Sequence, residues 1–212
     1  QTTSDHVVYR GGNGTDTLRI ALTLAQAADS TLISQIDDVI SGASTSVNAG
    51  GLDFSVDGFE TIIKGITIGD SFLPFDKVLL GNWQNNVLDV AAANGGLPTN
   101  DAYLVLGRSG SDTITGSDGN DILIGETTGD TMNGGAGDDV FLVASGDGDD
   151  VFNGGTGNDR VLAMEDNVEI SLSGNFGVAN DIQEISANGF SGVSVHGNWQ
   201  NNTLDFSGTT LT

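Results

Sequence analysis

Residues 107–142, GRSGSDTIT-GSDGNDILI-GETTGDTMN-GGAGDDVFL, form four consecutive nine-residue units in one register. After Val143 and Ala144 the count resumes with SGDGDDVFN from Ser145 and GGTGNDRVL from Gly154. The sixth position of every unit is aspartate, and the eighth is apolar. A separate copy, GGNGTDTLR, starts at Gly11. A short repeat of fixed period indicates a solenoid, in which stacked units bury a shared core.

Each unit divides into a turn and a short strand. Glycines at the first, second and fourth positions allow positive φ and close approach of backbones. Alternation along the strand sends the eighth side chain inward, so two units form one flat coil of turn, strand, turn, strand. Stacked coils would bury a ladder made of Ile114, Leu123, Met132, Phe141, Phe152 and Val161. The predicted fold is all-β, a right-handed parallel β-roll or β-solenoid with one short helical insertion.

The stacking also places an aspartate of each turn beside the aspartate two units away. Two carboxylates and several turn carbonyls can supply the roughly six to eight oxygens that Ca²⁺ takes, whereas Mg²⁺ prefers a smaller octahedron. The expected carboxylate pairs are Asp112 with Asp130, Asp121 with Asp139, Asp130 with Asp150, and Asp139 with Asp159. The predicted metal-site residues are these six aspartates, Asp16 of the separate copy, and the turn residues Gly107, Gly116, Gly134, Gly154, Asp118, Ala136 and Thr156.

The negative charge of the repeats indicates a cationic partner. Residues 107–162 hold ten aspartates and one glutamate against Arg108 and Arg160, a local charge of −9. About four divalent ions would nearly cancel this charge, and without them the stacked carboxylates repel one another. Several calcium ions, about four or more, are therefore expected as the cofactor.

Composition excludes other classes of function. The net charge is −23, which disfavours nucleic acid and anionic membrane surfaces as partners. The chain has no cysteine, and His6 and His196 are too isolated to suggest a zinc centre. No apolar run approaches the roughly 20 residues of a membrane span. The sequence has no nucleophile elbow, P-loop or HExxH motif, and evenly repeated acids make a poor catalytic pair, so we predict no enzyme.

The units GGNGTDTLR, GGAGDDVFL and GGTGNDRVL resemble the nonapeptide GGxGxDxUx of the RTX, or hemolysin-type calcium-binding, family. The resemblance covers residues 107–162 best. It implies a parallel β-roll with calcium in the turns, one-step (type I) secretion from a Gram-negative bacterium, and folding outside the cell. Arg108, Glu126 and Thr128 stand where glycine is usual, and the unit from Ser145 lacks its first glycine. These departures weaken the prediction for sites with Asp130 and Asp150 relative to the Asp121/Asp139 pair.

The flanks look like worn coils of the same solenoid. GNWQNNVLD from Gly81 and GNWQNNTLD from Gly197 repeat each other, with asparagine in the place of the turn aspartate. Asparagine keeps the turn chemistry but loses the charge, so no strong calcium site is expected there. The predicted domains are a degenerate solenoid module (1–106), the calcium-binding β-roll (107–162) and a second, incomplete degenerate module (163–212). We expect the chain to be one part of a tandem array.

One helix is predicted near residues 29–41, because apolar residues recur at helical spacing between Asp29-Ser30 and Ser41-Gly42. It would lie on the flank of the solenoid or cover its end. The segments 48–51 and 94–100 have the composition of loops. Asp16 has no stacking partner in the sequence, so its partner would come from a preceding repeat.

Three functions remain open. The favoured one is a calcium-stiffened structural repeat of an extracellular adhesin or surface-layer protein, whose partners are calcium and neighbouring repeats of the same protein. The alternative is a non-catalytic module of a secreted protease, lipase or alginate epimerase. The third is binding of a cell-surface or matrix glycan, because Trp83 and Trp199 lie beside asparagines. We favour packing of both rings at solenoid corners over sugar stacking.

Overall fold

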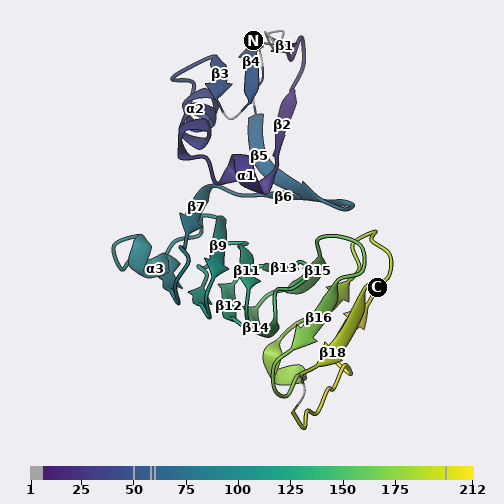
Figure 1. Cartoon of the computed structure of the whole chain (residues 1–212). Coiled ribbons are helices and arrows are strands. Elements are labelled where there is room, and N and C mark those ends of the chain that lie inside the picture. Colours follow the sequence, from purple (N-terminus) through teal and green to yellow (C-terminus); the bar gives the residue numbers. More distant parts are fainter. Residues whose placement is uncertain (1–6, 50, 58, 60, 199) are drawn as a thin grey trace. The chain divides into compact units, whose positions relative to one another are not determined.

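The computed structural model describes residues 7–49, 51–57, 59, 61–198 and 200–212. The chain divides into two compact units (Figure 1). The first comprises residues 1–67 and 72–74, and the second comprises residues 68–71 and 75–212. This division does not coincide with the module boundary predicted at residue 106, and the three-module division stays a prediction.

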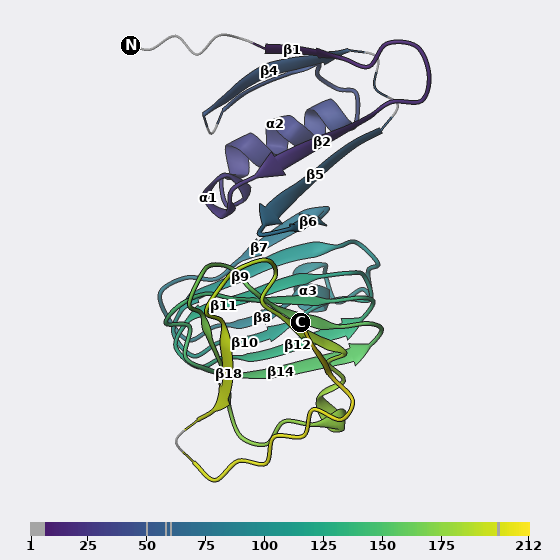
Figure 2. The same cartoon turned by 90° about the vertical axis from the view of Figure 1, so that its right-hand side faces the viewer.

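The second unit consists of two parallel sheets. Its seven-stranded sheet contains, in chain order, β7 (Lys77–Leu80), β9 (Tyr103–Ser109), β11 (Ile122–Thr127), β13 (Val140–Val143), β15 (Arg160–Ala163), β17 (Glu184–Ser186) and β19 (Thr210–Leu211). Its six-stranded sheet contains β8 (Val87–Asp89), β10 (Thr113–Thr115), β12 (Thr131–Ala136), β14 (Asp149–Thr156), β16 (Glu169–Leu172) and β18 (Ser194–Gly197). Successive strands alternate between the sheets, and neighbours within a sheet run parallel (Figure 2). The predicted parallel β-roll is therefore confirmed.

The register of the strands follows the nonapeptide. Ile114 pairs with Met132, and Leu123 pairs with Phe141, so equivalent positions two units apart lie side by side. After the two inserted residues, Met132 still pairs with the eighth position of its partner unit, Phe152. The insertion is thus absorbed between the strands and leaves the stacking unchanged.

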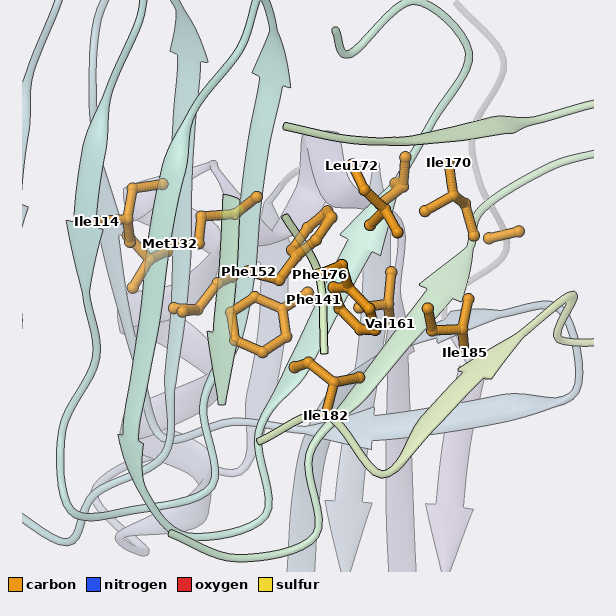
Figure 3. Packing of buried hydrophobic residues seen from close by; sticks show 14 of the residues in the cluster. Ile114, Met132, Phe141, Phe152, Val161, Ile170, Leu172, Phe176, Ile182 and Ile185 are labelled. Atoms are coloured by element: carbon orange, nitrogen blue, oxygen red, sulfur yellow. The ribbon is translucent and has the colours of Figure 1, made fainter. Parts of the chain in front are cut away.

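The core of the roll is the predicted apolar ladder. All six eighth-position side chains are at most 1% exposed, and they belong to one cluster that continues through Ile170, Leu172 and Ile185. Phe141 and Phe152 meet edge to face with ring centroids 5.5 Å apart (Figure 3). Burial of each such side chain contributes roughly 1.5–3 kcal/mol, so the ladder is a principal source of stability in the roll.

Two short helical segments interrupt the second unit. Helix α3 (Val90–Ala93) follows β8 and is capped by Asp89, whose side chain accepts a hydrogen bond from the backbone of Ala92. The predicted loop at 94–100 follows it. The 3₁₀ segment η1 (Val178–Asn180) lies between β16 and β17 and ends in Asp181, which has a left-handed backbone with φ 49°.

The first unit contains two three-stranded sheets. One has the order β1 (Val7–Arg10), β4 (Leu52–Asp57), β3 (Ser46–Ala49), and the other the order β2 (Thr17–Leu22), β5 (Thr61–Ile68), β6 (Ser71–Pro74). β1 and β4 are parallel, as are β2 and β5. β3 and β4 are antiparallel, an arrangement that the coils of a parallel solenoid do not contain. The loop predicted at 48–51 is wrong for Asn48 and Ala49, which end strand β3, and residue 50 lies outside the described residues.

The predicted helix near residues 29–41 is confirmed as α2 (Ser30–Ile40). Asp29 caps it by accepting hydrogen bonds from the backbone N–H groups of Thr31 and Leu32, at 2.9 and 3.1 Å. Its buried face packs against β3. The sequence did not reveal the preceding short helix α1 (Leu24–Ala27). None of the helices in the described residues has the length and apolar character needed to cross a membrane.

Candidate metal centre

Turns two units apart are in backbone contact, and glycine at the fourth position permits it. Gly137 has φ +108°, and a Cβ there would lie 2.5 Å from the carbonyl oxygen of Gly119. Gly110 has φ +105°, and a Cβ there would lie 2.6 Å from the backbone of Gln84. Any side chain at these positions would force the turns apart. At positions 110 and 137 glycine is therefore required for the turns to stack this closely.

The stacked turns bring the predicted aspartate pairs together. In each pair the backbone N–H of the first aspartate donates to the carboxylate of the second. The distances from N to Oδ1 are 2.7 Å for Asp112–Asp130, 2.8 Å for Asp121–Asp139, 2.9 Å for Asp130–Asp150 and 2.9 Å for Asp139–Asp159. All six aspartates are at most 3% exposed. The turns thus hold two ladders of buried carboxylates.

Several of these carboxylates have one oxygen that no protein donor reaches. Within the described part of the chain, a buried Oδ2 atom without a hydrogen-bond partner occurs in Asp112, Asp130, Asp139 and Asp159. A Cβ at Gly134 would overlap Asp139 Oδ2 and approach the carbonyl oxygen of Gly154 to 2.6 Å. Asp139 Oδ2 and the carbonyl oxygen of Gly154 thus border the same small space. Burial of an unpaired carboxylate oxygen is costly, and a cation or a proton removes that cost.

Asp121 differs from the other aspartates because the protein itself satisfies it. Its Oδ1 accepts from the backbone N–H of Tyr103 at 2.7 Å. Its Oδ2 accepts from the N–H of Ser117 at 2.5 Å and from the Ser117 hydroxyl at 2.9 Å. The sequence ranked the Asp121/Asp139 pair above those with Asp130. In the structure Asp130 and Asp139 each have an unpartnered Oδ2. Asp121 does not, because Ser117 at the second position of its own unit donates to it.

Burial perturbs the acidity of the ladder. It raises the pKa of Asp130 and of Asp139 to about 7, and neighbouring carboxylates add to the rise. It raises the pKa of Asp150 to about 8. Backbone hydrogen bonds oppose these shifts without cancelling them. A fully ionised ladder is therefore unfavourable at neutral pH unless positive charge lies beside it.

The predicted turn ligands fall into two groups. The first-position glycines Gly107, Gly116, Gly134 and Gly154 all border the oxygen of their own aspartate and a carbonyl of the following turn. The third-position residues are not among the nearest neighbours of these glycines, and metal binding by them stays a prediction. Asp118 is exposed, and Thr156 already accepts a hydrogen bond from Gly137 N–H at 2.9 Å. Ala136 lies in β12, paired with Thr156 of β14.

Asp16 of the separate copy lies in the first unit. Its turn contains Gly12 and Gly14, both with positive φ, and a Cβ at either would meet nothing within 4 Å. The described residues therefore place no second turn on these glycines. Calcium binding at Asp16 stays a prediction.

Two residues at the ends of the ladders had not been singled out as contacts of the aspartates. The N–H of Asn86 donates to Asp112 Oδ1 at 2.6 Å. The N–H of Asp159 donates to Gln183 Oε1 at 2.6 Å. Gln183 therefore takes the place of a further aspartate, although it lies outside the nonapeptides. The sequence spacing held no signal for it, because the loop before β17 has no regular period.

Outside the ladders, the structure corrects the expectation for Trp83 and leaves those for Trp199 and His6 untested. Trp83 is 76% exposed, so the predicted packing of this ring at a solenoid corner is wrong. Trp199 and His6 lie outside the described residues. His196 is exposed on β18, with Nε2 3.6 Å from a carboxylate oxygen of Glu169.

Three residues that replace glycine in the repeat adopt a backbone conformation that is unfavourable for residues with a side chain. Arg108, Glu126 and Thr128 have φ values of 78°, 66° and 81°, the left-handed region that glycine occupies in the other units. These side chains did not change the turn. The stacking of the turns instead imposes the backbone conformation on them.

The candidate metal ligands are oxygen atoms, and the carboxylates among them are arranged in pairs. No three His, Cys, Asp or Glu side chains converge as a metal-binding group in the residues that the structure describes. Two carboxylates per pair and the adjoining carbonyls are what the turns offer. This set suits a hard cation of flexible coordination.

Comparison with known families agrees with this geometry. The model of the RTX calcium-binding nonapeptide repeat matches residues 106–141 and 143–167, in four copies. Comparison with curated proteins and with solved structures gave no significant match.

Proposed function

We propose that this chain, whose residues 106–167 are RTX calcium-binding repeats, is a structural module that calcium folds and stiffens. The observation that carries the proposal is the set of buried Oδ2 atoms without partners in stacked turns. The carboxylate pairs and the adjoining turn carbonyls would hold the ions. A divalent ion supplies positive charge between carboxylates that otherwise repel one another.

Calcium suits the site better than other biological cations. The donors are carboxylate and carbonyl oxygens, which hard cations prefer. The chain has no cysteine to supply the soft ligands of zinc or copper. Mg²⁺ demands a near-ideal octahedron and retains its waters, which a set of buried turn carbonyls accommodates poorly.

Calcium dependence would determine the compartment in which the module folds. Cytosolic calcium is too scarce to fill extracellular-type sites with dissociation constants of about 10⁻⁴–10⁻³ M. The chain would remain unfolded during export and fold outside the cell, because ion binding contributes directly to folding free energy. RTX repeat proteins are generally secreted by Gram-negative bacteria, which supports this order of events. A repeat of an adhesin or surface-layer protein would use the stiffness that results.

The alternative to a repeat of an adhesin or surface-layer protein is a non-catalytic module of a secreted enzyme. The roll would then assist the folding of a catalytic domain encoded elsewhere in the same gene. The sequence of the complete gene separates the two alternatives. Further copies of this module support the adhesin or surface-layer role, whereas a neighbouring catalytic domain supports the accessory role.

Far-UV circular dichroism of the whole chain tests calcium-dependent folding. The expected result is loss of β signal in chelator and recovery when calcium is added back. Asp139→Asn should shift the titration midpoint to higher calcium, since it neutralises a buried carboxylate. Asp38→Asn is the control, because Asp38 is an exposed aspartate of helix α2, outside the nonapeptide turns. A spectrum that ignores both chelator and calcium would overturn the proposal.

One observation favours an additional role in glycan binding. Trp83 is 76% exposed and Val87 is 80% exposed, beside exposed Gln84 and Asn85. An exposed aromatic ring flanked by amides suits the apolar face and hydroxyls of a sugar. A glycan array should detect binding that Trp83→Ala abolishes, and the absence of binding by the calcium-loaded chain would remove this role.

A further inference from the structure

The four carboxylate pairs leave one buried oxygen unexplained. In the pairs that begin with Asp112, Asp130 and Asp139, the first aspartate contributes the unpartnered Oδ2. Asp159 is the last nonapeptide aspartate and appears in the pairs only as a second member. It is nevertheless 0% exposed, and its Oδ2 has no hydrogen-bond partner among the described residues. A group from the chain that follows lies beside this oxygen.

The carbonyl of Asp181 faces it. A Cβ at Gly154 would overlap both Asp159 Oδ2 and the carbonyl oxygen of Asp181. The two oxygens thus border one space, as Asp139 Oδ2 and the Gly154 carbonyl do one turn earlier. Asp181 reaches this position through its left-handed backbone at the end of η1. A turn that is not a nonapeptide therefore reproduces the oxygen arrangement of one.

The side chain of Gln183 also takes the place that a turn aspartate has in the nonapeptide pairs. In the preceding pairs the N–H of the first aspartate donates to a carboxylate oxygen. The N–H of Asp159 donates instead to the amide oxygen Oε1 of Gln183, at 2.6 Å. The parallel pairing of β15 with β17, in which Val161 lies opposite Ile185, fixes Gln183 in this place. Amide oxygens are established calcium ligands in proteins.

The N-terminal end of the other ladder, which begins at Asn86 and continues through Asp112, lacks these features. Asn86 also replaces an aspartate, but its Oδ1 accepts a hydrogen bond from Asn82 N–H at 2.7 Å. Its amide nitrogen donates back to Asn82 Oδ1 at 3.3 Å. The turn is therefore satisfied internally. The unpartnered oxygen distinguishes the C-terminal end from this one.

We propose that Asp159, the Asp181 carbonyl and the Gln183 amide oxygen form an additional calcium position at the C-terminal end of the ladder. This inference rests on the calcium-binding function proposed above and extends it to residues beyond the nonapeptides. Its proposed side-chain ligands are one carboxylate and one amide, whereas the paired positions have two carboxylates, so this position should be the weakest of the series. Its ion would tie the loop around η1 to the last nonapeptide turn and order the roll beyond residue 167.

Ion counting on the full chain tests the position. Native mass spectrometry gives the maximum number of bound calcium ions, and calorimetric titration gives the affinity of the weakest step. Gln183→Leu removes the amide oxygen and should lower the count by one. Gln183→Glu keeps the length and adds a carboxylate, so it should keep the count and tighten the weakest step about tenfold. Gln200→Leu is the control, because Gln200 is exposed and should change neither quantity.

The outcomes separate this inference from the proposed function. If the parent chain binds calcium and Gln183→Leu retains every ion, the additional position is wrong and the paired sites stand. If the parent chain binds no calcium, both proposals fail. Should Gln183→Leu fail to fold, Gln183→Glu decides, since an unchanged weakest affinity in that variant overturns the position.

Discussion

The backbone N–H of Asp130 donates a 2.9 Å hydrogen bond to Oδ1 of Asp150, although two inserted residues lengthen the chain between them. The same contact joins Asp112 to Asp130, where the intervening chain has no insertion. The structure thus preserves the contact between stacked carboxylates in preference to equal spacing along the chain. This preference is expected if ions between the turns stabilise the fold.

The raised pKa values predict an unusual pH dependence of the calcium-free chain. Asp130, Asp139 and Asp150 have folded pKa values of about 7 to 8, above the ordinary 3.8 expected for the unfolded chain. Between about pH 4 and pH 8 the folded state therefore holds more protons than the unfolded state. Its free energy of unfolding should fall as the pH rises through this window.

Far-UV circular dichroism in chelator follows the folded fraction from pH 8 to pH 5, and the β signal that chelator removes near neutral pH should return toward pH 5. Calcium competes with the protons, so saturating calcium should abolish the fall or reverse its direction. Greater stability of the calcium-free chain at pH 8 than at pH 5 would contradict the burial of these carboxylates.

Thr128→Gly should stabilise the module by about 1 kcal/mol, because Thr128 has φ 81° and a β-branched residue is strained there. The matched control is Thr113→Gly in strand β10, where glycine should destabilise by roughly 0.5–1 kcal/mol. Urea midpoints at saturating calcium measure both changes. Equal destabilisation by the two substitutions would show that position 128 is not strained.

Ser117→Ala should destabilise the chain at limiting calcium by roughly 1–3 kcal/mol, because it removes a hydroxyl donor from the buried Asp121 carboxylate. Saturating calcium should stabilise this variant more than it stabilises the parent chain, since Asp121 Oδ2 then keeps only the backbone N–H of Ser117 as a donor and can bind an ion. Thermal melts at limiting and at saturating calcium measure the difference. Ser111→Ala in an exposed turn should leave both melts unchanged, and the idea fails if Ser117→Ala behaves like it.

Phe152→Ala should cost about 3–5 kcal/mol, because the ring is 1% exposed and packs edge to face on Phe141. Val87→Ala serves as a surface reference, since Val87 is 80% exposed and lies on β8 at the edge of the six-stranded sheet. Its expected cost is within about 0.5 kcal/mol. Denaturant unfolding at saturating calcium compares the two. A small loss for Phe152→Ala would mean that the apolar ladder contributes little.

The sequence predicts the roll because one short period determines its structure. A nine-residue unit fixes the turn glycines, the inward side chain and the contact two units away. The six buried apolar positions and the four aspartate pairs followed from spacing alone. Helix α2 was predictable for a comparable reason, since its apolar period and its capping Asp29 are both local signals.

The remaining features depend on contacts that no local period records. The hydroxyl of Ser117 satisfies Asp121 only because the turn folds back on itself. Gln183 reaches Asp159 through an irregular loop, so counting in nines passes over it. The antiparallel β3–β4 pair interrupts a chain otherwise expected to contain worn parallel coils. In each case tertiary packing determines the contact, and no periodic pattern in the sequence predicts it.

Hydrogen exchange at the ladder amides tests the central claim most directly. The N–H groups of Asp112, Asp121, Asp130 and Asp139 all donate to the carboxylate of the next turn, and the amides of helix α2 provide an internal reference in the first unit. Strong protection of the four amides in calcium and its loss in chelator is the predicted result. Equal protection of those amides in both conditions would contradict the claim that calcium holds the turns together.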